Sequence, residues 1–172
     1  MKPSLISRKN FLGKMLLSTG GIMTLPSLVK ATQDDEKKPI SPTLIKEFVG
    51  KAHNNMDRVK ELYEEEPQLI FAAWDWGNGD FELGIGSASH VGYKELALFL
   101  LEKGAPMNLF TASMLGKIEI VKPILTAFPS QLNARGPHGF TALHHAIKGQ
   151  DDSLEVKEYL ESLGAKETKI KF

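Results

Sequence analysis

Apolar residues recur three and four positions apart in four short stretches of residues 43–172, and a shorter segment, with small residues where two helices would cross, precedes each of them. This spacing places the apolar side chains on one face of a helix. It predicts four helix pairs, and because no pair can bury its apolar face alone, the pairs should stack on one another. The expected first helices are 43–53, 85–91, 110–115 and 142–148, and the expected second helices are 57–64, 95–102, 119–126 and 155–162.

The residues around the second helices support these boundaries. Each second helix begins with an acidic residue, which favours a helix N-terminus. Gly104 and Gly164 follow two of them, and glycine is the usual residue just beyond a helix C-terminus. The other two end before Pro67 and Pro129, which also stop a helix.

Two segments resemble ankyrin repeats. Asn133–Gly139 followed by Thr141–Ala146 is similar to the turn, threonine cap and short helix that open such a repeat, and 83–108 resembles the pattern from Ala88 onward. The resemblance implies an all-α ankyrin repeat solenoid of about four helix-turn-helix repeats. The expected repeats are 43–74, 75–108, 109–133 and 134–172. More narrowly, 73–80 and 135–139 resemble a family of small bacterial ankyrin proteins.

The third unit departs from this pattern. Only 24 residues separate Gly92 from Gly116, whereas an ankyrin repeat takes about 33. The third unit is therefore expected to lack its hairpin, while the hairpin at 74–80 is longer than usual. A missing hairpin beside an enlarged one predicts a shaped binding surface.

Residues 1–31 are expected to be a cleaved signal peptide. A basic start precedes a weakly apolar run at 15–29, too short to span a bilayer comfortably, and small residues before Thr32 favour cleavage after Ala31. Residues 7–14 resemble the twin-arginine export motif, with Lys9 in place of the second arginine. The alternative is an uncleaved membrane anchor. Export to the periplasm or beyond is predicted, with a flexible linker at 32–42.

Composition restricts the possible partners. Residues 1–31 carry five basic and no acidic residues, so the remainder has 16 basic and 21 acidic residues and a net charge near −5. Such a body has no general attraction for nucleic acid. The absence of cysteine excludes disulfides and thiolate metal sites. We expect a monomer without cofactors and without stable membrane insertion after cleavage.

The predicted function is non-enzymatic binding of another exported protein. Both tryptophans lie in the enlarged hairpin, and tryptophan supplies much of the energy of interface hot spots. The alternative for one of the two rings is that it packs inward. The expected partner-binding residues are Trp74, Asp75, Trp76, Asp80, Phe81, Glu82, His53, His90, Met114, Arg135, His138 and Phe140.

The histidines suggest a second function. His53 and His90 fall near the ends of first helices and His138 at a hairpin tip, so an imidazole-lined groove that binds zinc, copper or a small ligand is the alternative. These histidines are distant in sequence without a local metal-ligand spacing, so no metal site is predicted. His144 is expected to bond to hairpin backbone. No catalytic motif is present, and no catalytic residue is predicted.

Overall fold

The computed structural model describes residues 38–171, which form one compact unit. The predicted signal peptide and residues 32–37 of the predicted linker lie outside the described residues. The helices are α2 (Pro42–Lys51), α3 (Met56–Glu65), α4 (Gly84–Val91), α5 (Lys94–Glu102), α6 (Leu109–Met114), α7 (Ile118–Ala127), α8 (Ala142–Lys148) and α9 (Leu154–Ser162). Single turns of 3-10 helix are η1 (Pro67–Phe71), η2 (Pro129–Asn133), η3 (Pro137–Gly139) and η4 (Gln150–Ser153).

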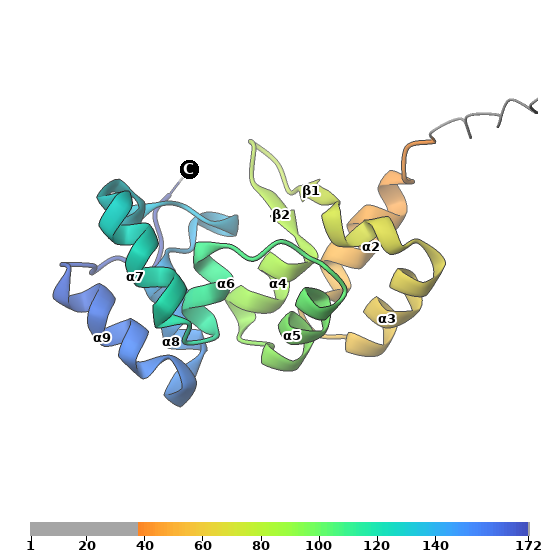
Figure 1. The fold of residues 1–172 in the computed structure, drawn as a ribbon. Helices are drawn as coiled ribbons and strands as arrows, with labels where there is room; N and C mark the ends of the chain where they lie inside the picture. The colour runs from red at the N-terminus through yellow and green to blue at the C-terminus, as the bar shows by residue number, and fades with distance from the viewer. Residues whose placement is uncertain (1–37, 172) are drawn as a thin grey trace, which may run out of the picture. The chain divides into compact units, whose positions relative to one another are not determined.

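The eight helices lie close to their predicted positions and follow one another as antiparallel pairs along the molecule (Figure 1). Side-chain caps explain several of the starts. Asn55 and Asn108 accept hydrogen bonds from backbone N–H groups in the first turns of α3 and α6, and Thr141 does so for α8. Gly104 and Gly164 adopt positive φ just past α5 and α9, as the pattern predicts.

The prediction of an all-α ankyrin repeat solenoid was wrong. Strands β1 (Ala73–Asp75) and β2 (Phe81–Leu83) form a two-stranded antiparallel sheet, in which Ala73 pairs with Leu83 and Asp75 with Phe81. The sheet projects from the row of helices in Figure 1. The units are also not copies of one repeat, because 105–108 join α5 to α6 without a strand and the last unit has η3 in that place. Helical periodicity cannot reveal strands of three residues.

Buried apolar side chains form two core clusters. One lies between the first helices and includes Phe48, Leu62 and Leu100, and the other lies towards the C-terminus and includes Val121 and Leu160. Helices α4, α6 and α8 pack side by side and connect the two clusters. None of the helices in 38–171 has the length and apolarity needed to cross a membrane.

His145 is a buried polar residue at this junction. Its Nδ1–H donates a 2.8 Å hydrogen bond to the carbonyl oxygen of Thr141, while its buried Nε2 has no hydrogen-bond partner among the described residues. Burial lowers the pKa of His145 to about 3, against the opposing effect of the Thr141 carbonyl. The folded protein therefore holds this imidazole neutral.

The buried neutral imidazole should make folding acid-sensitive. Because the pKa of His145 is lower in the folded state, its contribution is complete above about pH 6.5 and is lost as the pH falls towards 3. From pH 7 to 5.5 we expect this residue to lower the free energy of unfolding by about 1 kcal/mol. Urea unfolding at both pH values should give a smaller loss for His145→Leu than for the wild type. Equal losses in the two proteins would contradict the assignment.

Candidate metal centre

The β1–β2 hairpin fixes the position of a buried carboxylate. Gly77, Asn78 and Gly79 all adopt positive φ, a conformation that glycine and asparagine tolerate, and they reverse the chain between the strands. Side chains alternate along β2, so Phe81 is 60% exposed while the neighbouring Glu82 is fully buried. The hairpin therefore directs one acidic side chain into the body of the protein.

A second loop is held against this hairpin through Asp80. The backbone N–H of His138 donates to Asp80 Oδ1, and its ring Nδ1–H donates to Asp80 Oδ2, both at 2.7 Å. His138 lies in η3 and adopts a φ of 57°, which brings its backbone and its ring to the same carboxylate. These two bonds join residues 58 positions apart and leave His138 Nε2 facing Glu82.

Two helices supply the other imidazoles. His53 follows α2, and its Nδ1–H donates to the carbonyl oxygens of Gly50 at 3.0 Å and Val49 at 3.2 Å. His90 lies in the last turn of α4, where its ring stacks against Phe140 at a centroid distance of 5.2 Å. Both rings therefore have neighbours that restrict their orientation, and both present Nε2 to Glu82.

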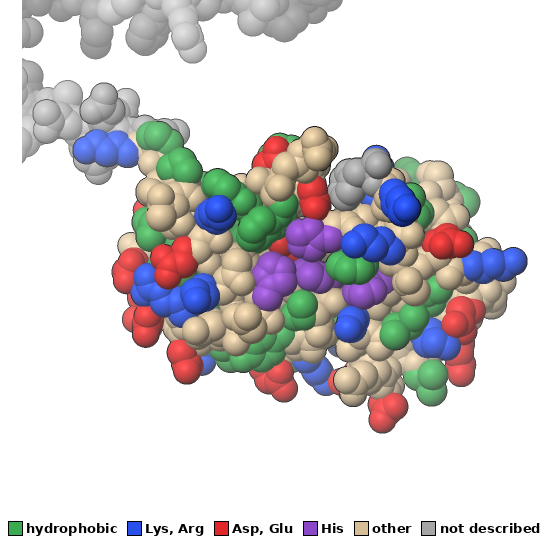
Figure 2. Space-filling view, turned by 180° about the vertical axis from the view of Figure 1, so that it is seen from behind, with side chains coloured by type: hydrophobic (Ala, Val, Ile, Leu, Met, Phe, Trp, Pro, Cys, Tyr) green, Lys and Arg blue, Asp and Glu red, His purple; other side chains and the backbone are tan. Residues whose placement is uncertain are grey.

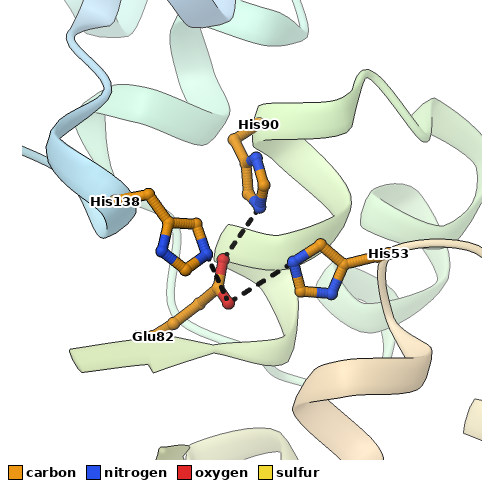
Figure 3. Close-up of side chains that lie close together, drawn as sticks. All are labelled: His53, Glu82, His90 and His138. Carbon is orange, nitrogen blue, oxygen red and sulfur yellow. Dashed lines mark ion pairs between the residues drawn. The ribbon is translucent and has the colours of Figure 1, made fainter. Parts of the chain in front are cut away.

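The four side chains converge on one point, as Figure 3 shows. His90 Nε2 lies 3.0 Å from Glu82 Oε1, while His138 Nε2 and His53 Nε2 lie 3.4 Å and 3.5 Å from Glu82 Oε2. One potential ligand atom from each residue lies within 4.8 Å of all the others. A tetrahedral zinc ion with ligands at 2.0–2.1 Å has ligand–ligand separations of about 3.4 Å. The cluster thus approaches the size of a tetrahedral metal site.

The carboxylate at the centre is ionised. Burial by itself raises the pKa of Glu82, but the neighbouring His90, the charge of His53 and a 2.8 Å hydrogen bond from the Trp76 indole N–H together hold the pKa below its usual value. Glu82 Oε1 and His90 Nε2 nevertheless lack a hydrogen-bond partner among the described residues, since their mutual geometry is not that of a hydrogen bond. Buried polar atoms of this kind are rare and call for a missing partner.

Neighbouring groups also determine which ring nitrogens are free. A carboxylate or carbonyl oxygen can only accept a hydrogen bond, so the Nδ1 atoms of His138 and His53 carry the protons. In a neutral ring with its proton on Nδ1, the Nε2 atom carries a lone pair, which here is directed at the centre. Metal-ligating histidines almost always donate the other ring N–H to a carboxylate or a backbone carbonyl. Asp80 and Gly50 provide those acceptors here.

Several of the residues predicted to bind a partner meet in this cluster, and others do not. His53, His90, His138 and Glu82 form it, while Asp80, Trp76 and Phe140 support it. The other predicted residues lie elsewhere. Met114 is buried in the core, Trp74 packs against the core beneath the ammonium of Lys46, Asp75 accepts from the Gly77 N–H, and Arg135 donates to the Lys171 carbonyl.

The geometry changes the interpretation of three residues. Trp76 is 39% exposed, yet its indole N–H positions the central carboxylate. His144, expected to bond to hairpin backbone, instead donates to the carbonyl oxygen of His90 at the end of α4. Glu82 was predicted only as a surface contact, although it is fully buried. One feature of the sequence does indicate the cluster: His53 and His90 occupy equivalent positions at the ends of successive first helices.

A cleft lies on the opposite face of β2. Phe81 and Leu83 of the hairpin form one wall, and Gly136 and Pro137 of the η3 loop form the other, with a volume of about 300 Å³. Phe110 also lines it, at the start of α6 where the third unit lacks a hairpin. The cleft is lined by residues of both hairpin regions in which partner-binding residues are predicted.

No protein-family model matches the chain, and no curated protein matches it. The function is therefore argued from the geometry of the site.

Proposed function

We propose that the protein binds a divalent transition-metal ion, with zinc the best fit, through His53, Glu82, His90 and His138. The observation that carries the proposal is the convergence of three Nε2 atoms on a fully buried, ionised carboxylate. Without a cation or an added proton, the Nε2 lone pairs of His53 and His138 face the carboxylate at 3.5 Å and 3.4 Å. A metal ion would turn these contacts into bonds.

The choice of metal follows from the donor atoms. Imidazole nitrogen suits zinc, copper and nickel, whereas magnesium and calcium prefer sites built from oxygen. The site has three nitrogen donors and one carboxylate, and the chain has no cysteine. Zinc accepts four such ligands in a tetrahedral arrangement without a redox change.

Titration of the chelator-treated full-length protein with zinc, followed by calorimetry, tests this proposal. We expect one equivalent of zinc to bind per chain. His53→Ala, His90→Ala and His138→Ala should each weaken binding by at least about 10-fold, since each removes a ligand. Asp80→Asn should weaken it by about 10- to 100-fold, because the amide no longer fixes the His138 ring as a carboxylate does.

His144→Ala is the matched control for the loss of an imidazole. His144 bonds to the backbone carbonyl of His90 and stacks on Phe140, but it offers no ligand atom to the centre, so its loss should change zinc affinity by no more than a few-fold. The absence of saturable binding of zinc, copper or cobalt would reject the proposal. Equal affinity in the wild type and all three histidine variants would also reject it.

A second candidate function is binding of an exported protein partner at the cleft between the β1–β2 hairpin and the η3 loop. The exposure of Phe81 favours it, because this aromatic side chain lies at the rim of a cleft largely lined by apolar groups. A partner with an apolar side chain and an extended backbone would fit a cleft of about 300 Å³.

Photo-crosslinking gives this candidate a direct test. A benzophenone amino acid at position 81 should form a discrete adduct in the exported fraction. The control position is Phe128, which is 64% exposed against 60% for Phe81 but lies at the end of α7, away from the cleft. Equal yields at the two positions would contradict a specific partner site.

A further inference from the structure

The candidate metal centre is open to solvent on one side. Glu82 is fully buried and the His90 side chain is 8% exposed, whereas the His53 and His138 side chains are 23% and 26% exposed. Histidine side chains accordingly gather on one face of the molecule in Figure 2. A metal ion held here would have protein beneath it and accessible space above it, and zinc can take a fifth ligand in such a position.

A hollow of about 500 Å³ adjoins this open side. Its lining consists of Asp80, His138, Phe140, Lys169 and Lys171, so it shares His138 with the metal centre. Phe140 forms an isolated β-bridge with Lys169, which fixes the C-terminal segment beside the site. The Lys169 ammonium lies 4.8 Å from the centroid of the Phe140 ring, and that ring lies 6.2 Å from the His138 ring.

The charge left over in the hollow is positive. Both oxygens of Asp80 accept hydrogen bonds from His138, and among the described residues Asp80 forms no ion pair with either lysine. Neither Lys169 nor Lys171 forms an ion pair with a carboxylate within 38–171. Two ammonium groups therefore lie beside a metal centre, in a domain whose overall charge is negative.

We propose that this hollow binds a small dianionic molecule, with one oxyanion group on the metal ion and a second at Lys169 and Lys171. This inference rests on the proposed function. The ring distances above place the Lys169 ammonium at most about 11 Å from the centre of the His138 ring, so one short molecule can span the metal ion and this lysine. A molecule with two separated carboxylates or phosphates can contact the metal ion with one group and the lysines with the other. Carboxylate and phosphate oxygens bind metal ions and also accept hydrogen bonds from ammonium groups.

Cobalt-loaded full-length protein tests the inference, because the visible spectrum of bound cobalt reports a new ligand. Glutarate should change the spectrum and bind at least 10-fold more tightly than acetate. The double variant Lys169→Met, Lys171→Met should bind cobalt normally but reduce the preference for glutarate to less than 3-fold. Methionine keeps an apolar stem, so packing on Phe140 is retained.

Lys122→Met is the matched control, since its ammonium also lies over an aromatic ring, at 5.9 Å from Tyr159, but far along the chain from the hollow. It should keep the full preference. If cobalt does not bind, the proposed function fails. If cobalt binds but glutarate and acetate bind equally, or the double variant keeps the preference, this inference alone is overturned.

Discussion

Zinc at a hundredfold excess over its Kd is expected to raise the free energy of unfolding by about 2.7 kcal/mol. The reason is that its ligands come from the end of α2, strand β2, helix α4 and the η3 loop, which meet only in the folded chain. For a domain of this size the melting temperature should rise by about 10 °C. Thermal unfolding with zinc and with a chelator measures the difference.

Glu82→Gln should remove most of that increment. The amide keeps the volume of the side chain and can still accept from the Trp76 indole, but it lacks the charge that attracts the metal ion. A 100-fold loss of affinity would leave about 0.4 kcal/mol at the same zinc concentration. Glu61→Gln makes the same chemical change on the exposed face of α3 and should keep the full increment. An undiminished increment in Glu82→Gln would count against the carboxylate as a ligand.

Gly116→Ala is expected to lower the free energy of unfolding by about 3 kcal/mol or more. Gly116 follows α6 with a φ of 68°, a conformation that alanine adopts at a cost. A Cβ there would also overlap the carbonyl oxygen of Asp152 and lie 3.2 Å from the Cα of Ser153. Both obstacles are backbone atoms of η4, so neither can move aside without shifting α9. Urea unfolding of the two proteins measures the loss.

Gly164→Ala separates the two causes. Gly164 also has a positive φ, of 94°, but a Cβ there would meet no atom within 4 Å. This variant should lose only about 1 kcal/mol, the cost of the backbone conformation alone. If both variants lose the same amount, contact between α6 and η4 contributes nothing to the cost at Gly116.

The positions of the helices could be predicted because they depend on local properties of the chain. The spacing of Leu96, Phe99 and Leu100, for example, is itself the apolar face of α5, and Gly104 ends that helix through its own backbone freedom. The β1–β2 sheet was missed as part of the fold class, because three-residue strands are stabilised by pairing and leave little periodicity in the sequence.

The candidate metal centre depended on contacts that no local pattern contains. His53 and His138 are 85 positions apart, and they approach the same carboxylate only because Asp80 holds the η3 loop against the β1–β2 hairpin. The sequence has no local metal-ligand spacing and therefore predicted no metal site, although the same histidines were expected to line a groove. The residue types alone indicate that these histidines can bind a metal ion. That they converge on Glu82 is visible only in the packed structure.

The sequence by itself determined where the chain forms helices, where glycine and proline end them, and which residues carry reactive side chains. Only the tertiary structure decided that Glu82 is buried and that three imidazoles surround it. The physical reason is that helix formation follows from neighbours three and four positions away, whereas a metal centre requires ligand atoms within a few ångströms from separate elements.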